Sequence, residues 1–152
     1  MPVHMVAEPD PPLPPALGLL LRLLHQHWGE DVDAALRAAG LHGIRAAHAN
    51  VFPFVPPDGI PVSELARLAT MRKQSMAEAV DQLERAGYVQ RRPDPTDRRA
   101  RRVFLTERGA AVRAVAVAAG REVEQRWAAL TGPGEIEAVR ATLLTLLGRL
   151  RG

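Results

Sequence analysis

The sequence predicts a mainly α-helical protein with one small β-hairpin, and three observations support this fold class. Segments at both ends of the chain repeat apolar residues at the spacing of amphipathic helices. Two short helical segments lie near the middle, separated by only a few residues. Directly after them, two strand-like runs flank a turn rich in proline and aspartate.

The composition fits this interpretation. The 152 residues suit one domain or a small domain with added helices, and 47% hydrophobic residues can build a core. The net charge is only +3, while the isoelectric point is about 10.5, because Lys73 is the only lysine and the other cations are arginines. A codon bias explains much of this excess, so the positions of the arginines carry more information than their number.

The chain contains no cysteine, which excludes disulfides, cysteine-bound zinc and thiol-based redox sensing. The apolar run over residues 16–24 is too short to span a bilayer and is interrupted by Arg22. No basic segment typical of a signal peptide precedes it. We therefore expect a soluble, cytoplasmic protein, and the sequence indicates no cofactor.

The N-terminal third predicts a proline-rich arm followed by one long helix. Residues 1–15 lack a helical period and are expected to be disordered. The helix begins at Ala16, follows an i, i+3, i+4, i+7 pattern and ends before Gly40. Gly29 marks a bend or a break in it. Residues 44–52 predict a second helix, which a cluster of prolines ends.

The middle of the chain predicts a helix-turn-helix and a hairpin. Residues 63–69 and 72–86 form the two helices, and Gly87 is placed to cap the second one. Residues 88–92 and 101–105 predict strands, and residues 93–97 the turn between them. Together these elements make a winged helix. The buried stripe of the second helix consists of Met76, Val80 and Leu83.

Two further helices complete the chain. Thr106 can cap a long helix that extends to about residue 130. Residues 131–134 (TGPG) break it, and residues 135–150 predict the last helix.

The second helix of the helix-turn-helix has a polar outer face. Opposite its buried stripe lie Gln74, Glu78 and Asp81, with Lys73 and Ala77 beside them. Glutamine can pair with adenine, lysine with guanine, and glutamate can accept from cytosine. The alternative is an ordinary solvated face on which Asp81 pairs with Arg85.

The hairpin is rich in arginine. Such a density of positive charge favours a polyanionic partner, and a narrow basic ribbon suits the DNA minor groove. Asp97 is placed to hold the Arg99 side chain in an extended pose. The alternative is a solubilising loop. The hairpin arginines are Arg91, Arg92, Arg98, Arg99, Arg101 and Arg102, offset only by Asp94 and Asp97.

Other candidate residues give weaker signals. A ligand pocket is predicted around Trp28, His48, Phe52 and Phe54, although core aromatics are the more common interpretation. His25 and His27 do not share a helix face, so a metal site is not expected. The sequence has no nucleophile–base pair and no phosphate-binding glycine loop, and it does not predict an enzyme.

With these residues in view, the chain resembles the MarR family of winged-helix transcription regulators. The resemblance covers residues 16–150 in element order and is most specific over residues 65–109. Its three motifs are LERAGYV (residues 83–89), DPTDRRA (residues 94–100) and LTERG (residues 105–109).

The resemblance implies a homodimer with interlocked terminal helices that binds a pseudopalindromic DNA operator. It further implies a repressor that a small aromatic or phenolic ligand releases. It divides the chain into an arm (1–15), an N-terminal dimerisation region (16–42), a DNA-binding domain (43–106) and C-terminal dimerisation helices (107–152). Asp97 supports the wing. The expected DNA contacts are Arg72, Lys73, Gln74, Ser75, Ala77, Glu78, Arg98, Arg99 and Arg101.

The chain also departs from the family pattern. Arg72 stands where the family usually has a small hydroxyl residue that caps the recognition helix, and Thr70 stands where glycine is common. Thr70 is therefore expected to cap the helix, or the helix start is expected to shift. The absence of cysteine, and of histidine between residues 107 and 130, argues against peroxide and zinc sensing. The competing functions are a ligand-independent DNA binder and a protein-interaction module.

Overall fold

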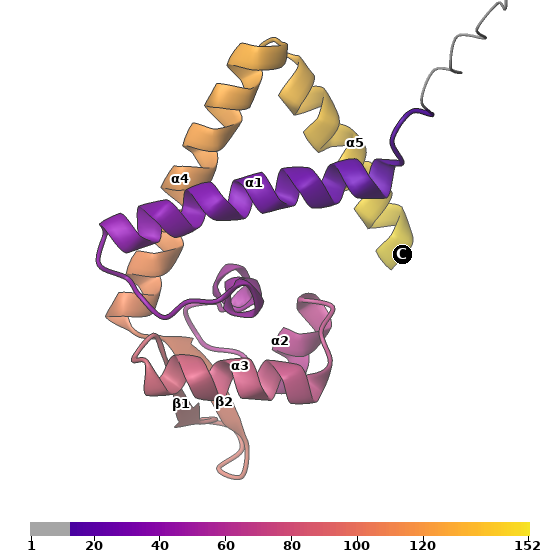
Figure 1. Ribbon diagram of the computed structural model, residues 1–152. Helices are drawn as coiled ribbons and strands as arrows, with labels where there is room; N and C mark the ends of the chain where they lie inside the picture. The colour runs from indigo at the N-terminus through magenta and orange to yellow at the C-terminus, as the bar shows by residue number, and fades with distance from the viewer. Residues whose placement is uncertain (1–12) are drawn as a thin grey trace, which may run out of the picture.

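The computed structural model describes residues 13–152 and is drawn in Figure 1. Residues 1–12, most of the predicted disordered arm, lie outside the described residues. The elements are α1 (Leu17–Ala38), the 3-10 helices η1 (Ala46–Asn50) and η2 (Phe52–Phe54), α2 (Val62–Leu68), α3 (Lys73–Arg85), β1 (Val89–Pro93), β2 (Arg101–Leu105), α4 (Glu107–Thr131) and α5 (Glu135–Arg151).

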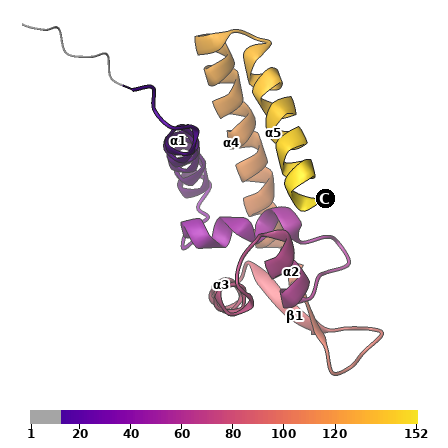
Figure 2. The same ribbon diagram turned by 90° about the vertical axis from the view of Figure 1, so that its right-hand side faces the viewer.

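The molecule has two halves. The helical half consists of α1, α4 and α5: α1 lies across α4, and α5 runs back beside α4 (Figures 1 and 2). The winged half, residues 46–105, holds both 3-10 helices, α2, α3 and the hairpin, which projects from the body as a narrow ribbon (Figure 2). The predicted fold class, mainly α with a small β-wing, is confirmed.

Helix α1 is continuous. Of the bend or break predicted at Gly29, the break does not occur, since the helix runs unbroken from Leu17 to Ala38. Gly29 sits within the helix with open space around it. Backbone N–H groups after the last turn close the end, including that of Leu41, which donates to the carbonyl of Leu36 at 2.9 Å. The 22-residue rod therefore spans the whole helical half.

The predicted helix over residues 44–52 is wrong in type. This segment forms the short 3-10 helices η1 and η2 instead. Pro53 has no backbone N–H and cannot extend an α-helical ladder. The segment is held by burial, since Val51, Phe52 and Val55 are at most 4% exposed. We call residues 39–61, which join α1 to α2, the connector.

The helix-turn-helix is built as predicted. The apolar stripe of α3 (Met76, Ala79, Val80 and Leu83) is buried in the core of the winged half. Gly87 follows the helix at φ 85°, a conformation that side chains with a Cβ rarely adopt. This sharp reversal lets the N–H of Tyr88 bond the carbonyl of Leu83 at 2.9 Å and directs the chain into β1.

The hairpin is antiparallel and is tied to the helix-turn-helix. In its register Val89 faces Leu105 and Pro93 faces Arg101. Ile60, just before α2, forms a bridge with Val103 through two backbone hydrogen bonds of 3.0 and 2.8 Å. The base of the wing and the start of α2 therefore form one unit.

Thr106 joins the wing to α4 as predicted. Its hydroxyl accepts from the backbone N–H of Gly109 at 3.2 Å, which caps the helix, and donates to the carbonyl of Gly87 at 2.6 Å. Gly109 is required here because a Cβ at this position would lie 2.0 Å from the carbonyl oxygen of Tyr88. The C-terminal end of α3 and the start of α4 are thereby fixed together.

The helical half leaves a large apolar surface open. Leucines along the first half of α1 are 40–64% exposed, and those of α5 reach 74%. Among residues 13–152, no helix combines the length and apolar character needed to cross a membrane. The exposed side chains on α1 and α5 include Leu17, Leu20, Leu24, Val139, Leu144, Leu147 and Leu150.

Candidate nucleic-acid interface

Helix α3 presents its polar face to the outside. Its apolar stripe faces the core, so the opposite face is free. The structure places Lys73, Gln74 and Ser75 in the exposed first turn, Glu78 one turn further along the same side, and Ala77 in a partly buried position beside them. These are the side chains that sequence analysis assigned to base and backbone contacts. The structure brings them onto one continuous surface.

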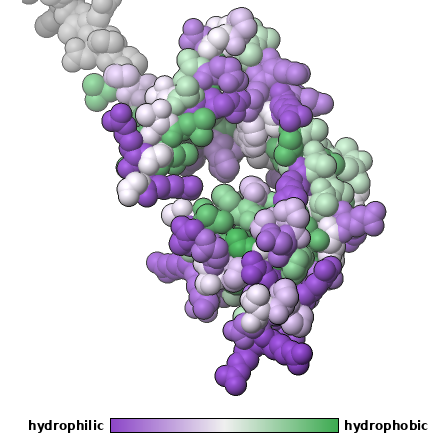
Figure 3. Space-filling model, turned by 180° about the vertical axis from the view of Figure 1, so that it is seen from behind, coloured by the Kyte–Doolittle hydropathy of each residue, from purple (hydrophilic) through white to green (hydrophobic). Residues whose placement is uncertain are grey.

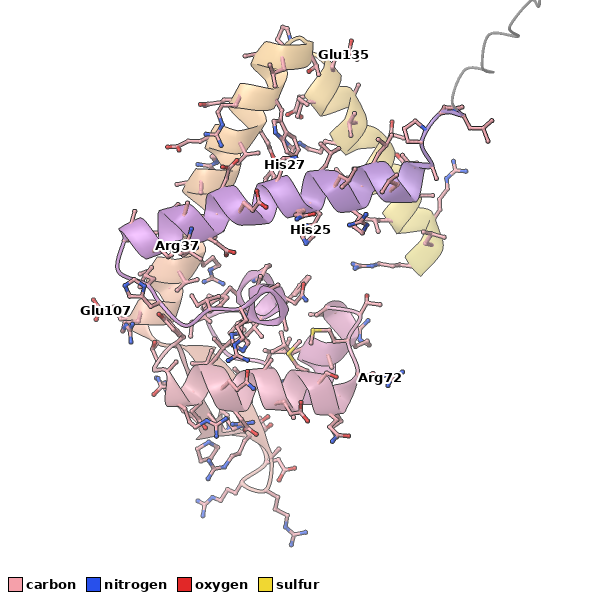
Figure 4. All side chains as sticks on the ribbon, viewed as in Figure 1. His25, His27, Arg37, Arg72, Glu107 and Glu135 are labelled. Carbon is pink, nitrogen blue, oxygen red and sulfur yellow. The ribbon has the colours of Figure 1, made fainter. Side chains whose placement is uncertain are left out.

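The start of α3 has no side-chain cap. Arg72 occupies the N-cap position with extended backbone angles, and its side chain points away from the body (Figure 4). The expectation that Thr70 caps the helix, or that the helix start shifts, is wrong, because α3 begins at Lys73 and no side chain bonds its first turn. Thr70 instead adopts a left-handed conformation (φ 55°) in the turn. Such a conformation costs a residue with a Cβ about 1–2 kcal/mol.

Three of the six hairpin arginines are structural. Arg91 lies between two carboxylates of α3, 2.7 Å from Asp81 and 3.0 Å from Glu84. Asp81 therefore pairs with Arg91 of β1 and not with Arg85, the partner that the alternative interpretation predicted. Arg102 bonds Asp94 at 3.1 Å and the carbonyl of Gly59 at 3.2 Å. The third, Arg92, stacks 4.7 Å from the ring centre of Phe104.

The remaining three arginines are free. Arg98, Arg99 and Arg101 are exposed, and none of them forms an ion pair within residues 13–152. The carboxylates of α3, which sequence analysis did not count, therefore offset part of the hairpin charge as well. Arg91 and Arg102 are paired with carboxylates, whereas Arg92 stacks on Phe104 without an ion pair among the described residues, so three of the four arginines that lack an ion pair lie at the tip end of the hairpin. Figure 3 shows hydrophilic side chains at the projecting lower end of the molecule.

Aspartates fix the backbone of the tip. Asp97 was expected to hold the Arg99 side chain, but its Oδ1 accepts from the backbone N–H of Arg99 at 3.0 Å. Asp97 therefore sets the shape of the turn and leaves the guanidinium free. Asp94 is buried and accepts from the backbone N–H and hydroxyl of Thr96 at 2.8 and 2.7 Å. These bonds, together with Arg102, hold the pKa of Asp94 below its usual value.

Sequence analysis missed the structural role of Asp94. It placed this residue in the turn and counted it as a negative charge offsetting the hairpin arginines, but assigned its carboxylate no bond. The signal was present in the spacing: an aspartate two residues before a threonine is typical of an Asx turn, in which the carboxylate bonds the backbone two residues further on. Asp94 thus organises the turn from its base.

A cavity of about 670 Å³ lies between the helical and winged halves. Trp28 and Phe52 line it, as predicted for the ligand pocket, whereas His48 and Phe54 are not among its lining residues. Sequence analysis missed its charged members, which include Arg113, Arg121 and Glu124. The guanidinium of Arg113 donates to the backbone carbonyl of Val55, the residue directly after η2, at 2.7 Å. Figure 3 shows the hollow, with apolar residues along its border.

A second apolar groove, of about 580 Å³, runs between α1, α4 and α5. It is lined from α1 by Leu24, from α4 by Trp127 and from α5 by Leu147. Trp28 lies between this groove and the cavity and packs edge-on against Trp127, with ring centres 6.0 Å apart.

The histidines are spread over the molecule. His25 and His27 extend from different sides of α1 (Figure 4). Within the described part of the chain, no group of three or more His, Asp or Glu residues is placed to hold a metal ion. His48 is buried and bonds Gln82.

The elements and their order define the class of protein. A helix-turn-helix whose second helix is free on one side, followed by a tied two-stranded hairpin, is a winged helix-turn-helix. The model of the MarR family matches residues 57–100, which include α2, α3 and the wing tip.

Solved structures share this fold over most of the chain. A probable transcriptional regulator from Pseudomonas aeruginosa is 27% identical, with a TM-score of 0.66, covering 86% of this chain and 96% of its own. CouR from Rhodococcus jostii RHA1, bound to p-coumaroyl-CoA, is 25% identical with a TM-score of 0.67 and covers 86% and 90%. CouR bound to a 23-mer DNA duplex is 24% identical, with a TM-score of 0.71 and coverage of 87% and 92%.

A search of curated proteins gives no match. Residues 57–100 are thus similar to the MarR family of winged-helix transcription regulators, and a probable transcriptional regulator that is 27% identical shares the fold over most of the chain.

Proposed function

We propose that this protein is a homodimeric repressor that binds a pseudopalindromic DNA operator and is released by a small aromatic or phenolic ligand. One observation carries the DNA-binding part: three unpaired arginines stand on a pre-shaped wing tip beside the free polar face of α3. The proposal needs no cofactor and no catalytic group, and it places the protein in the cytoplasm.

In this proposal α3 enters the major groove. Lys73 and Gln74 reach base edges from its first turn, and Glu78 accepts from a cytosine amine. Arg72 and Ser75 contact phosphates, and Ala77 packs against the backbone or a thymine methyl group. The first-turn N–H groups of α3, which no side chain caps, add donors for a phosphate.

The wing enters the adjacent minor groove. Arg98, Arg99 and Arg101 carry the positive charge there, because Arg91 and Arg102 are paired with carboxylates and Arg92 stacks on Phe104. The negative potential of a narrow minor groove favours arginine. Asp97 supports this arrangement through the backbone of the tip.

The homodimer covers the open apolar surface of the helical half. Leucines of α1 and α5 that are 40–74% exposed in one chain are favourable to bury, at about 25 cal/mol per Å². Residues 16–42 and 107–152 form the dimer, and residues 43–106 form the DNA-binding domain. Two such domains related by a twofold axis explain why the operator is a pseudopalindrome.

The cavity between the halves is the proposed ligand site. Its aromatic residues, Trp28 and Phe52, and its nearby arginines suit a planar ligand with an acidic group. CouR, similar in fold, carries p-coumaroyl-CoA in its crystal structure, which supports this class of ligand.

Selection of bound sequences from a random duplex pool tests the DNA-binding part. We expect enrichment of a motif with dyad symmetry, and an affinity that falls steeply with salt concentration. A protein-interaction module would enrich no motif. Titration of the selected duplex complex with a panel of phenolic acids then tests the ligand part. Unchanged affinity across the panel would favour a ligand-independent DNA binder.

A further inference from the structure

His48 is a buried polar residue without a role in the proposed DNA contacts. It is 3% exposed and lies in η1 of the connector. Its Nδ1 accepts from the backbone N–H of Arg45 at 3.0 Å, so the ring proton resides on Nε2. Nε2 then donates to Oε1 of Gln82 at 2.7 Å. The ring therefore joins the connector to α3.

This bond differs in kind from the packing of the apolar stripe of α3. Apolar burial is favourable but has no preferred direction. A hydrogen bond requires a narrow range of distance and angle. The bond from His48 to Gln82 therefore restricts rotation of α3 about its own axis. That rotation decides where Lys73 and Gln74, two turns earlier on the helix, are directed.

The connector that carries His48 also forms a wall of the cavity. The cavity lining includes Trp28 of α1 and three residues that follow His48 in the chain, Ala49, Phe52 and Pro53. The wall consists of 3-10 helices of five and three residues. Such short turns have poorer hydrogen-bond geometry than an α-helix and often act as hinges. A molecule bound between Trp28 and Phe52 would therefore contact these 3-10 helices and could displace them.

We propose that the His48–Gln82 hydrogen bond transmits the occupancy of the cavity to α3. His48 is then a positioning residue for DNA recognition. With the cavity empty, the connector holds α3 in its DNA-reading orientation. An occupant displaces the connector, breaks or bends the bond, and frees α3 to turn. This inference rests on the proposed function, since it specifies how its two sites communicate.

The test uses substitutions that replace an unidentified ligand. Ala116 lines the cavity from α4, so Ala116→Trp places an indole where an aromatic ligand would lie. Ala114→Trp, on an exposed position of the same helix, is the matched control. Gln82→Leu removes the acceptor of the bond and, because Gln82 is exposed, leaves the core intact. Gln82→Glu keeps an acceptor oxygen at this position.

Two readouts are measured on the full chain: hydrogen exchange of the α3 amides, and affinity for the selected duplex. We expect Ala116→Trp to speed exchange in α3 and to lower affinity roughly 5- to 150-fold, the usual range of coupling between sites. Gln82→Leu alone should give a loss of the same order, and the double variant no further loss. Gln82→Glu should behave as the unmodified chain, and Ala114→Trp should change neither readout.

Two results would overturn the inference. If the two losses simply multiply in the double variant, the bond stabilises the fold without transmitting the state of the cavity. If Ala116→Trp leaves exchange in α3 unchanged, the cavity wall does not reach the helix. Failure of the proposed function would be recognised separately, because the unmodified chain would then select no duplex. Hydrogen exchange of the α3 amides would still show whether the cavity and α3 are coupled.

Discussion

The winged half and the helical half of this molecule differ in how completely one chain buries its apolar side chains. Val80, Leu83 and Tyr88 in the winged half are fully buried. In the helical half, Leu24 is 46% and Leu150 is 74% exposed. The winged half is therefore complete within a single chain, whereas the helical half presents a surface that a second copy is suited to cover. We therefore expect DNA recognition and dimer assembly to depend on different residues.

The largest effect should come from a charge placed in the open half. Leu147 lines the groove between α1, α4 and α5 and is 49% exposed in one chain. Leu147→Glu would bury an unpaired carboxylate in a dimer, at a cost of several kcal/mol. We expect a monomer by analytical ultracentrifugation, and operator affinity lower by roughly 100-fold or more because bivalent binding is lost. Leu147→Met should remain a dimer, and a dimeric Leu147→Glu variant would contradict the assembly model.

A smaller effect is expected at the wing tip. Arg99→Ala should weaken operator binding by about 1–3 kcal/mol and lower the salt slope by about 1, without altering thermal stability. Mobility-shift titrations at several salt concentrations measure both quantities. Arg126→Ala removes the same charge from α4, where the side chain pairs with Asp31, and should leave binding unchanged. Equal losses for the two variants would indicate a general charge effect.

Lys73→Ala and Gln74→Ala address which bases α3 reads. Each should lose about 1–3 kcal/mol of discrimination at particular base pairs, with less change at the others. Repeating the duplex selection with each variant identifies those positions. A uniform loss across all sequences would mean that the side chain contacts phosphate.

Unlike Arg99→Ala, a substitution of Arg91 should change the stability of the fold and not the binding of DNA. Its side chain is 18% exposed and bridges two carboxylates of α3, so Arg91→Ala should lower the free energy of unfolding by about 1 kcal/mol. The salt slope of duplex binding should not change. Chemical denaturation and the same titrations measure both effects, and a reduced slope for Arg91→Ala would place this arginine on DNA.

The smallest effect concerns Asp94. Because its pKa is lowered in the folded chain, it contributes stability above its ordinary value of 3.8, and this contribution is lost as the pH falls through the lower folded value. The difference in stability between the unmodified chain and Asp94→Asn should be constant above about pH 5 and should shrink in stronger acid. Urea unfolding over this range measures it. A difference independent of pH would show that the carboxylate is not the source.

Local sequence patterns predicted much of the fold. The spacing of Met76, Val80 and Leu83 identified the buried side of α3, and Gly87 marked its end. The range of β2 was predicted correctly, because the turn between the strands has strong local preferences. Thr106 capped its helix as expected. In each case the deciding interactions lie within a few residues of one another.

The errors came from contacts between distant parts of the chain. Six hairpin arginines look alike in sequence, and only the packing of β1 on α3 shows that Arg91 meets Asp81. His48 was expected to face a ligand, but the fold directs it to Gln82, 34 residues away. The 3-10 helices escaped prediction because burial of Phe52 outweighs the weak local preference of that segment.

The bridge between Ile60 and Val103 has a consequence for the length of the operator. Because it ties the base of the wing to the residues just before α2, the tip and α3 cannot move apart independently. In the proposed complex, the distance from the bases under α3 to the groove under the tip is therefore fixed. Inserting one base pair between these two points should be tolerated far less well than changing the identity of a base that neither of them contacts.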